Sequence, residues 1–85
     1  MNRVILVGKF GTEKRKDWDQ DVVVSEREVK GAKKIETIPV WMPSDLSRPV
    51  PGDIVWVEGT LFVNSNRFLS CRVVRWEMVL RGGRP

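Results

Sequence analysis

The segment from Asp53 to Val63 alternates between two kinds of side chain, and this pattern constrains the fold more than any other in the sequence. Every second residue from position 55 onward is Val, Gly or Leu, whereas the residues between them include Trp56 and Phe62. Successive side chains of a β-strand point to opposite faces, so this period of two predicts a strand with one buried face. The side chains predicted to face the core are those of Val55, Val57, Leu61 and Val63.

Four other segments are rich in the residue types that favour strands. They span Asn2–Phe10, Asp21–Lys30, Lys33–Met42 and Arg67 to about Leu80. The stretch from Pro43 to Pro51 contains prolines and leaves room for one helical turn at most. We therefore expect an all-β protein, a five-stranded OB-fold barrel in which the helix between strands three and four is reduced or absent, with an SH3-like barrel as the structural alternative. Residues 1–80 are predicted to form this domain and residues 81–85 a short basic tail.

Several function classes are disfavoured by the residue types that are missing. The chain has no His and a single cysteine, Cys71, so Ser-His and Cys-His nucleophile pairs, Cys-cluster metal sites and an internal disulfide are excluded. We expect a non-catalytic protein without a cofactor or metal, and Cys71 is predicted to be a small core residue. A nuclease built on Asp17, Asp19 and Asp21 is a weaker alternative, since it rests only on their close spacing.

The apolar run from Val4 to Val7 is too short for the core of a signal peptide or for a membrane span. A cytoplasmic protein with no membrane partner is the expectation. Fifteen Lys and Arg against eleven Asp and Glu give a net charge of +4. With a pI near 9.7, this charge is typical of domains that bind a polyanion such as nucleic acid.

Two segments resemble the bacterial single-stranded DNA-binding protein family. Residues 2–8, Asn-Arg-Val-Ile-Leu-Val-Gly, are similar to its first strand, N-[RK]-V-x-L-[VI]-G, and residues 52–61 are similar to its fourth, G-x-x-[VI]-[YW]-[VI]-E-G-x-[LI]. The resemblance implies an OB fold, sequence-tolerant binding of single-stranded DNA in replication, recombination or repair, and a homodimer or homotetramer. If the protein is bacterial, it also implies association with the nucleoid.

The sequence departs from this family at its end and in its second and third strands. The chain finishes Arg-Gly-Gly-Arg-Pro in place of an acidic tail, and Glu28 and Glu36 stand near the places of the family's stacking tryptophans. A tail-less, primosomal PriB-like member is therefore one alternative, and an OB-fold module for protein assembly is another. RNA is the other candidate ligand.

Sequence-tolerant binding of a single strand needs aromatic platforms for the bases and cations along the phosphates. The predicted platforms are Trp56, Phe62, Phe68, Trp41 and Trp76, and the predicted cations are Lys33, Lys34, Arg67, Arg72 and Arg75. Trp56 and Phe62 have a subunit interface as their alternative role, and Trp76 has closure of the barrel. Trp18 is interpreted either as a lid on its charged loop or as a further stacking residue.

Overall fold

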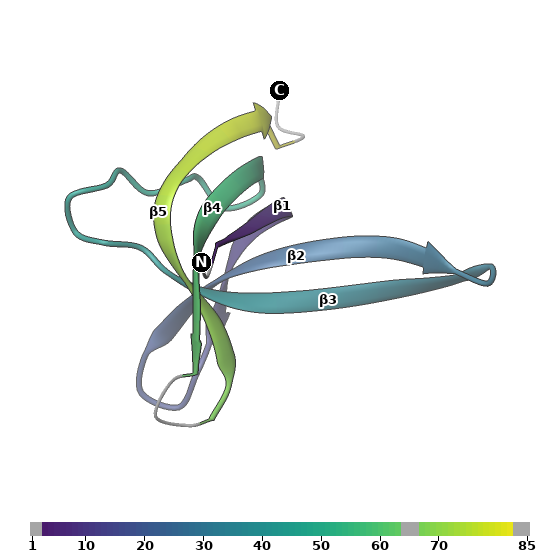
Figure 1. Ribbon diagram of the computed structural model, residues 1–85, viewed down its shortest axis with the longest axis horizontal. Coiled ribbons are helices and arrows are strands. Elements are labelled where there is room, and N and C mark those ends of the chain that lie inside the picture. Colours follow the sequence, from purple (N-terminus) through teal and green to yellow (C-terminus); the bar gives the residue numbers. More distant parts are fainter. Residues whose placement is uncertain (1–2, 64–66, 83–85) are drawn as a thin grey trace.

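Four antiparallel strand pairings and one parallel pairing close the chain into a barrel with the order β1-β2-β3-β5-β4 (Figure 1). The computed structural model describes residues 3–63 and 67–82. Within this part of the chain there is no helix, and the strands are β1 Val4–Lys14, β2 Asp19–Val29, β3 Ala32–Trp41, β4 Ile54–Val63 and β5 Leu69–Leu80. The predicted five-stranded OB-fold barrel is therefore confirmed.

Strand β1 belongs to both halves of the barrel. Its first part, Val4 to Lys9, pairs with β4, and its second part, Lys9 to Lys14, pairs with β2. At the change of partner, a Cβ on Gly8 would lie 2.3 Å from the carbonyl oxygen of Val24. Only glycine permits this close approach of two backbones, so Gly8 fixes the point where the barrel turns.

All five strands contribute to the core. The buried cluster consists of Phe10, Val23, Val40, Val55, Val57, Cys71 and Val73. Cys71 is thus a core residue, as predicted, and its burial raises the pKa of its thiol. The prediction for Val63 is wrong, because its side chain is 64% exposed. It keeps the alternation of the strand, but it is the last residue of β4, in the part that runs with β5 toward the β4–β5 loop.

The barrel closes through a short parallel pairing of β3 with β5, at Val40 opposite Cys71 and Trp41 opposite Arg72. Gly59 on β4 faces this seam, since a Cβ there would lie 2.2 Å from the carbonyl oxygen of Arg72. The barrel wall therefore has no room for a side chain at Gly59.

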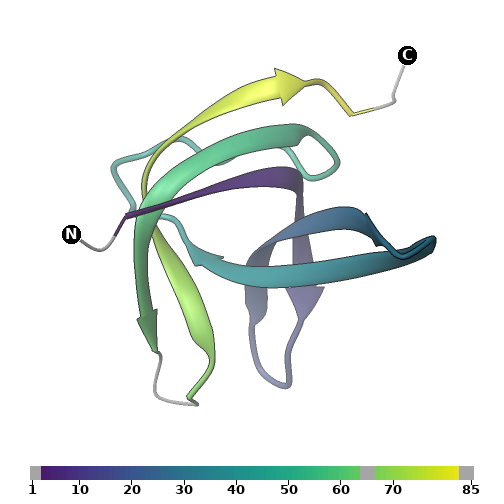
Figure 2. The same cartoon turned by 45° about the vertical axis from the view of Figure 1, so that its right-hand side comes forward.

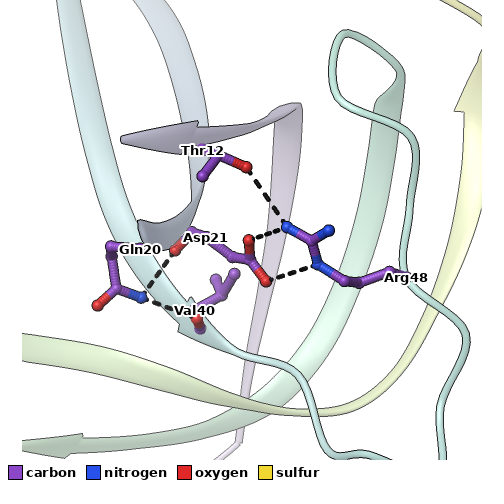
Figure 3. A network of polar contacts seen from close by, with 5 residues as sticks. All are labelled: Thr12, Gln20, Asp21, Val40 and Arg48. Atoms are coloured by element: carbon purple, nitrogen blue, oxygen red, sulfur yellow. Dashed lines mark hydrogen bonds and ion pairs between the residues drawn. The ribbon is translucent and has the colours of Figure 1, made fainter. Parts of the chain in front are cut away.

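The connection of residues 42–53 passes over one end of the barrel in place of a helix. Leu46 packs against the core, and the Ser47 carbonyl accepts a hydrogen bond of 2.8 Å from Nε1 of Trp76. Arg48 forms an ion pair with Asp21 and lies over the ring of Phe10, 5.7 Å from its centroid (Figure 3). The hydrogen bonds to Asp21 raise the pKa of Arg48 above its ordinary value, so this ion pair holds the connection in place over the usual pH range.

Strands β2 and β3 continue beyond the barrel as a two-stranded arm, residues 25–36 (Figure 1, Figure 2). Its turn uses positive φ angles at Lys30, 52°, and Gly31, 79°. Most of its side chains are exposed, because no other strand pairs with this part of the hairpin. The arm, and not the barrel wall, therefore carries Glu28, Lys33, Lys34 and Glu36.

The first strand is longer than predicted. Gly11 and Thr12 were expected to end it at Phe10, but β1 continues to Lys14 because these residues pair with β2, Gly11 opposite Val22 and Thr12 opposite Asp21. Local composition misplaced the boundary because a neighbouring strand supplies the hydrogen bonds. The predicted turn at residues 64–66 and the last three residues of the predicted basic tail, 83–85, lie outside the described residues.

Candidate nucleic-acid interface

Three aromatic rings from three distant parts of the sequence follow one another on the outside of the barrel. The rings of Trp18 and Trp41 are stacked, with centroids 6.2 Å apart and planes 23° apart. The Phe62 ring follows, 6.4 Å from that of Trp41 and tilted by 53°. The guanidinium of Arg72 lies over Phe62, 5.2 Å from the ring centroid. We call Trp18, Trp41, Phe62 and Arg72 the aromatic row.

The row takes its residues from one end of the barrel. Trp18 lies in the β1–β2 loop, where its carbonyl accepts a hydrogen bond of 2.8 Å from the backbone amide of Arg15. Phe62 is the second-last residue of β4, just before the β4–β5 loop. In both views the β1–β2 loop lies at the same end of the molecule as the end of β4 and the start of β5 (Figure 1, Figure 2). In OB folds this end, together with the face of strands two and three, is where oligonucleotides and oligosaccharides bind.

A buried amide positions the middle of the row. Gln20 is 3% exposed, and its Nε2 donates to the carbonyl of Val40 at 3.1 Å and to that of Asp21 at 3.0 Å (Figure 3). Because both partners are acceptors, the amide has one orientation that satisfies them. Gln20 thereby joins the end of β3 to β2 next to Trp41. The pairing of Trp41 with Arg72 then places Arg72 on the neighbouring strand, where its guanidinium lies over Phe62.

The row presents aromatic surface and an unmatched positive charge. Trp18 is 42% exposed and Trp41 is 44% exposed, which is a large area of indole left in contact with water. Among the described residues, no carboxylate lies within ion-pair distance of Arg72. Its N–H donors are therefore free to bind an anion while its guanidinium stays on Phe62.

A second cation–π pair lies on another part of the barrel, the outer face of β1 and β4. Arg75 covers Trp56, with its guanidinium 5.1 Å from the ring centroid. Its Nε also binds Glu58 at 2.7 Å, and Arg3 binds the same carboxylate at 3.4 Å. We call these four residues the Trp56 cluster. Unlike the aromatic row, its cations are held by a carboxylate.

The row does not include three further residues that are predicted to bind the strand, Trp76, Arg67 and Phe68. Trp76 packs against the core, and its indole N–H is used by the connection, a role in closing the barrel. Arg67 and Phe68 directly precede β5 and are exposed, Phe68 to 64%. They lie in the loop that follows Phe62 in the chain, at the same end of the barrel as the row.

The two predicted lysines of the arm point to opposite faces. Lys33 shares the outer face of Trp41, where its Nζ binds Glu26 at 3.7 Å and Glu28 stands opposite it. Lys34 is on the other face, opposite Arg27. The structure therefore does not bring Lys33 and Lys34 together as one cationic group.

Trp18 belongs to the aromatic row but was not among the predicted platforms. From the sequence, its role was open between a lid on its loop and a stacking residue. The available signal was a lone tryptophan in a charged loop, which does not say what the ring contacts. Two carboxylates of the nuclease hypothesis have cationic partners, since Asp21 binds Arg48 and Asp19 lies 3.8 Å from Lys14. In the described part of the chain no group of three or more metal-binding side chains occurs.

Comparisons with known proteins give no relative for this chain. A scan against protein-family models finds no match, and a search of curated proteins finds none either. The described residues also contain no helix that is long and apolar enough to cross a membrane.

Proposed function

We propose that the protein binds single-stranded DNA without catalysis, through the aromatic row. The observation that carries this proposal is a series of three rings, two exposed and one half-buried, that ends in an arginine with no carboxylate partner among the described residues. Bases stack on rings of any kind because every base has a π-face, and phosphates bind the free N–H donors of an arginine. The row supplies both at the end of an OB barrel that suits this ligand.

The resemblance to bacterial single-stranded DNA-binding proteins supports a role in replication, recombination or repair. RNA offers the same π-faces and phosphates, so it is the alternative ligand of the same row. The base contacts predicted at Trp56, Phe68 and Trp76, and the phosphate contacts predicted at Lys33, Lys34, Arg67 and Arg75, stay predictions. A PriB-like role in the primosome would use the same strand-binding surface.

A homodimer or homotetramer is the proposed assembly, and a specific face of the barrel favours it. Ile5 and Val7 are 59% and 50% exposed on β1, and Val7 stands opposite Trp56 on the same sheet. Apolar side chains gathered on one sheet face favour contact with another protein surface. This face also supports the rival function, an assembly module in which Trp56 is covered by protein and no strand is bound.

The proposal is tested by titrating the protein with oligo-dT while recording tryptophan fluorescence. Stacking of bases on Trp18 and Trp41 should quench the emission, and the binding constant should fall steeply with salt as counterions are released. A blunt-ended DNA duplex is the control, because its paired bases are not available for stacking. No quenching at low salt would contradict the proposal.

Light scattering with and without the oligonucleotide separates the two functions. A strand binder gains the mass of the oligonucleotide, whereas an assembly module keeps its own oligomer mass and gains nothing.

A further inference from the structure

We propose that the aromatic row holds only a short stretch of single strand, about four nucleotides per protomer, because carboxylates match or outnumber the cations on three sides of the row. This inference rests on the proposed function and specifies its ligand. The row gives platforms for about three bases at most, because Arg72 already covers one face of Phe62 and Trp18 stacks on Trp41. Arg72 gives one phosphate contact beside Phe62. This length lies at the lower end of the range that single OB folds bind.

The arm is the first side on which the strand would meet carboxylates. Its outer face continues that of Trp41 along β3, with Glu26 opposite Ile35 and Glu28 opposite Lys33. Lys33 is the single cation among these residues, and Glu26 already binds it. The arm as a whole carries four cations and three carboxylates, but on this face two carboxylates stand against one lysine. The face therefore supplies no unmatched cation for a phosphate backbone.

The β1–β2 loop is the second side. Around Trp18 the cations are matched by acids, since Arg15 binds Glu13 at 3.2 Å and Lys14 lies 3.8 Å from Asp19. Asp17 directly precedes Trp18 and offsets Lys16. The loop therefore offers a strand an aromatic ring but no excess of positive charge.

The outer face of β4 and β5 is the third side. Moving along β5 from Arg72, the next outward cation is Arg75, which Glu58 holds at 2.7 Å, and Glu77 follows it. Glu58 also holds Arg3. On this face the unmatched charge of Arg72 is thus local to the row, and a strand that follows β5 beyond Arg72 meets cations that Glu58 already binds.

The experiment is a length series of oligo-dT, from two to about sixteen residues, with affinities corrected for the number of binding registers. We expect the affinity to rise up to about four residues and then to change by less than about threefold. A corrected affinity that keeps rising more than about tenfold beyond four residues overturns the short site but leaves the proposed function standing. Failure of every length to bind overturns both.

A pair of charge-matched variants tests the role of the carboxylates. The double variant E26Q/E28Q should raise the preference for long over short oligonucleotides by about threefold or more, because the arm then accepts phosphates. The control E36Q/D45N removes the same number of charges, one from the other face of the arm and one from the connection. It should raise that preference less than E26Q/E28Q does. Equal preferences in the two double variants would overturn the boundary at the arm.

Discussion

Two arginines of β5 cover aromatic rings of β4 at nearly the same distance but with different consequences. Arg72 lies 5.2 Å from the centroid of Phe62, and Arg75 lies 5.1 Å from that of Trp56. Glu58 takes the charge of Arg75 at 2.7 Å, whereas Arg72 has no such partner among the described residues. The presence of a cation on an aromatic ring therefore does not by itself indicate a nucleic-acid site.

The difference lies in what surrounds each pair. The Phe62 ring continues into Trp41 and Trp18, so a ligand meets a series of platforms next to a free cation. In the Trp56 cluster the neighbouring residues of β1 are aliphatic and the carboxylate sits between two arginines. The first arrangement suits stacked bases and phosphates, and the second suits a contact with protein.

The largest expected effect separates the two regions directly. Trp41→Ala removes the central platform of the row and should weaken oligo-dT binding by about 1–3 kcal/mol, because each stacked base contributes that much. Trp56→Ala should change the affinity by less than about twofold. Fluorescence or anisotropy titration of both variants measures the difference. A stronger loss for Trp56→Ala would reverse the assignment of the two regions.

The next effect concerns stability, since the row is anchored by a buried amide and the Trp56 cluster is not. Gln20→Leu removes the donor to the carbonyls of Val40 and Asp21 and should lower the free energy of unfolding by about 1–3 kcal/mol. Urea denaturation measures it. Thr12→Val is the control in the same network, because its hydroxyl accepts only a long hydrogen bond of 3.4 Å from Arg48. Equal losses would show that Gln20 is not the anchor.

A smaller effect is expected from the two arginines. Arg72→Gln should reduce the slope of log affinity against log salt by about 0.7, the value for one phosphate contact on a single strand. Arg75→Gln should leave the slope unchanged, since Glu58 occupies that guanidinium. Titrations at several salt concentrations decide this. A change of slope only in Arg75→Gln would place the phosphate on the Trp56 side.

The smallest effect tests whether Glu58 keeps the Trp56 cluster from binding DNA. Glu58→Gln releases Arg75 and Arg3 and should strengthen oligo-dT binding by about twofold. Combining it with Trp56→Ala should abolish the gain. Asp45→Asn removes one charge from the connection, away from the Trp56 cluster, and serves as the matched control. A weakened affinity in Glu58→Gln would show that the carboxylate supports binding and would remove the contrast between the two regions.

Local patterns in the sequence predicted the elements better than the site. The alternation around Val55 and Val57 gave both the strand and its buried face correctly, because burial on one side of a strand imposes a period of two. It gave Val63 incorrectly, since the pattern does not say where the barrel ends. Gly11 was expected to end the first strand, yet its backbone pairs with Val22, a contact that composition does not contain.

By itself, then, the sequence determined five strands, an all-β core and the absence of histidine chemistry, because these depend on residue type and on contacts between near neighbours. Only the tertiary structure decided that Trp18, Trp41 and Phe62 meet while Trp56 stands elsewhere with its arginine neutralised. The physical reason is that closure of the barrel pairs Trp41 with Arg72, residues far apart in the chain. Their register depends on close backbone approaches at Gly8 and Gly59, which strand periodicity does not encode.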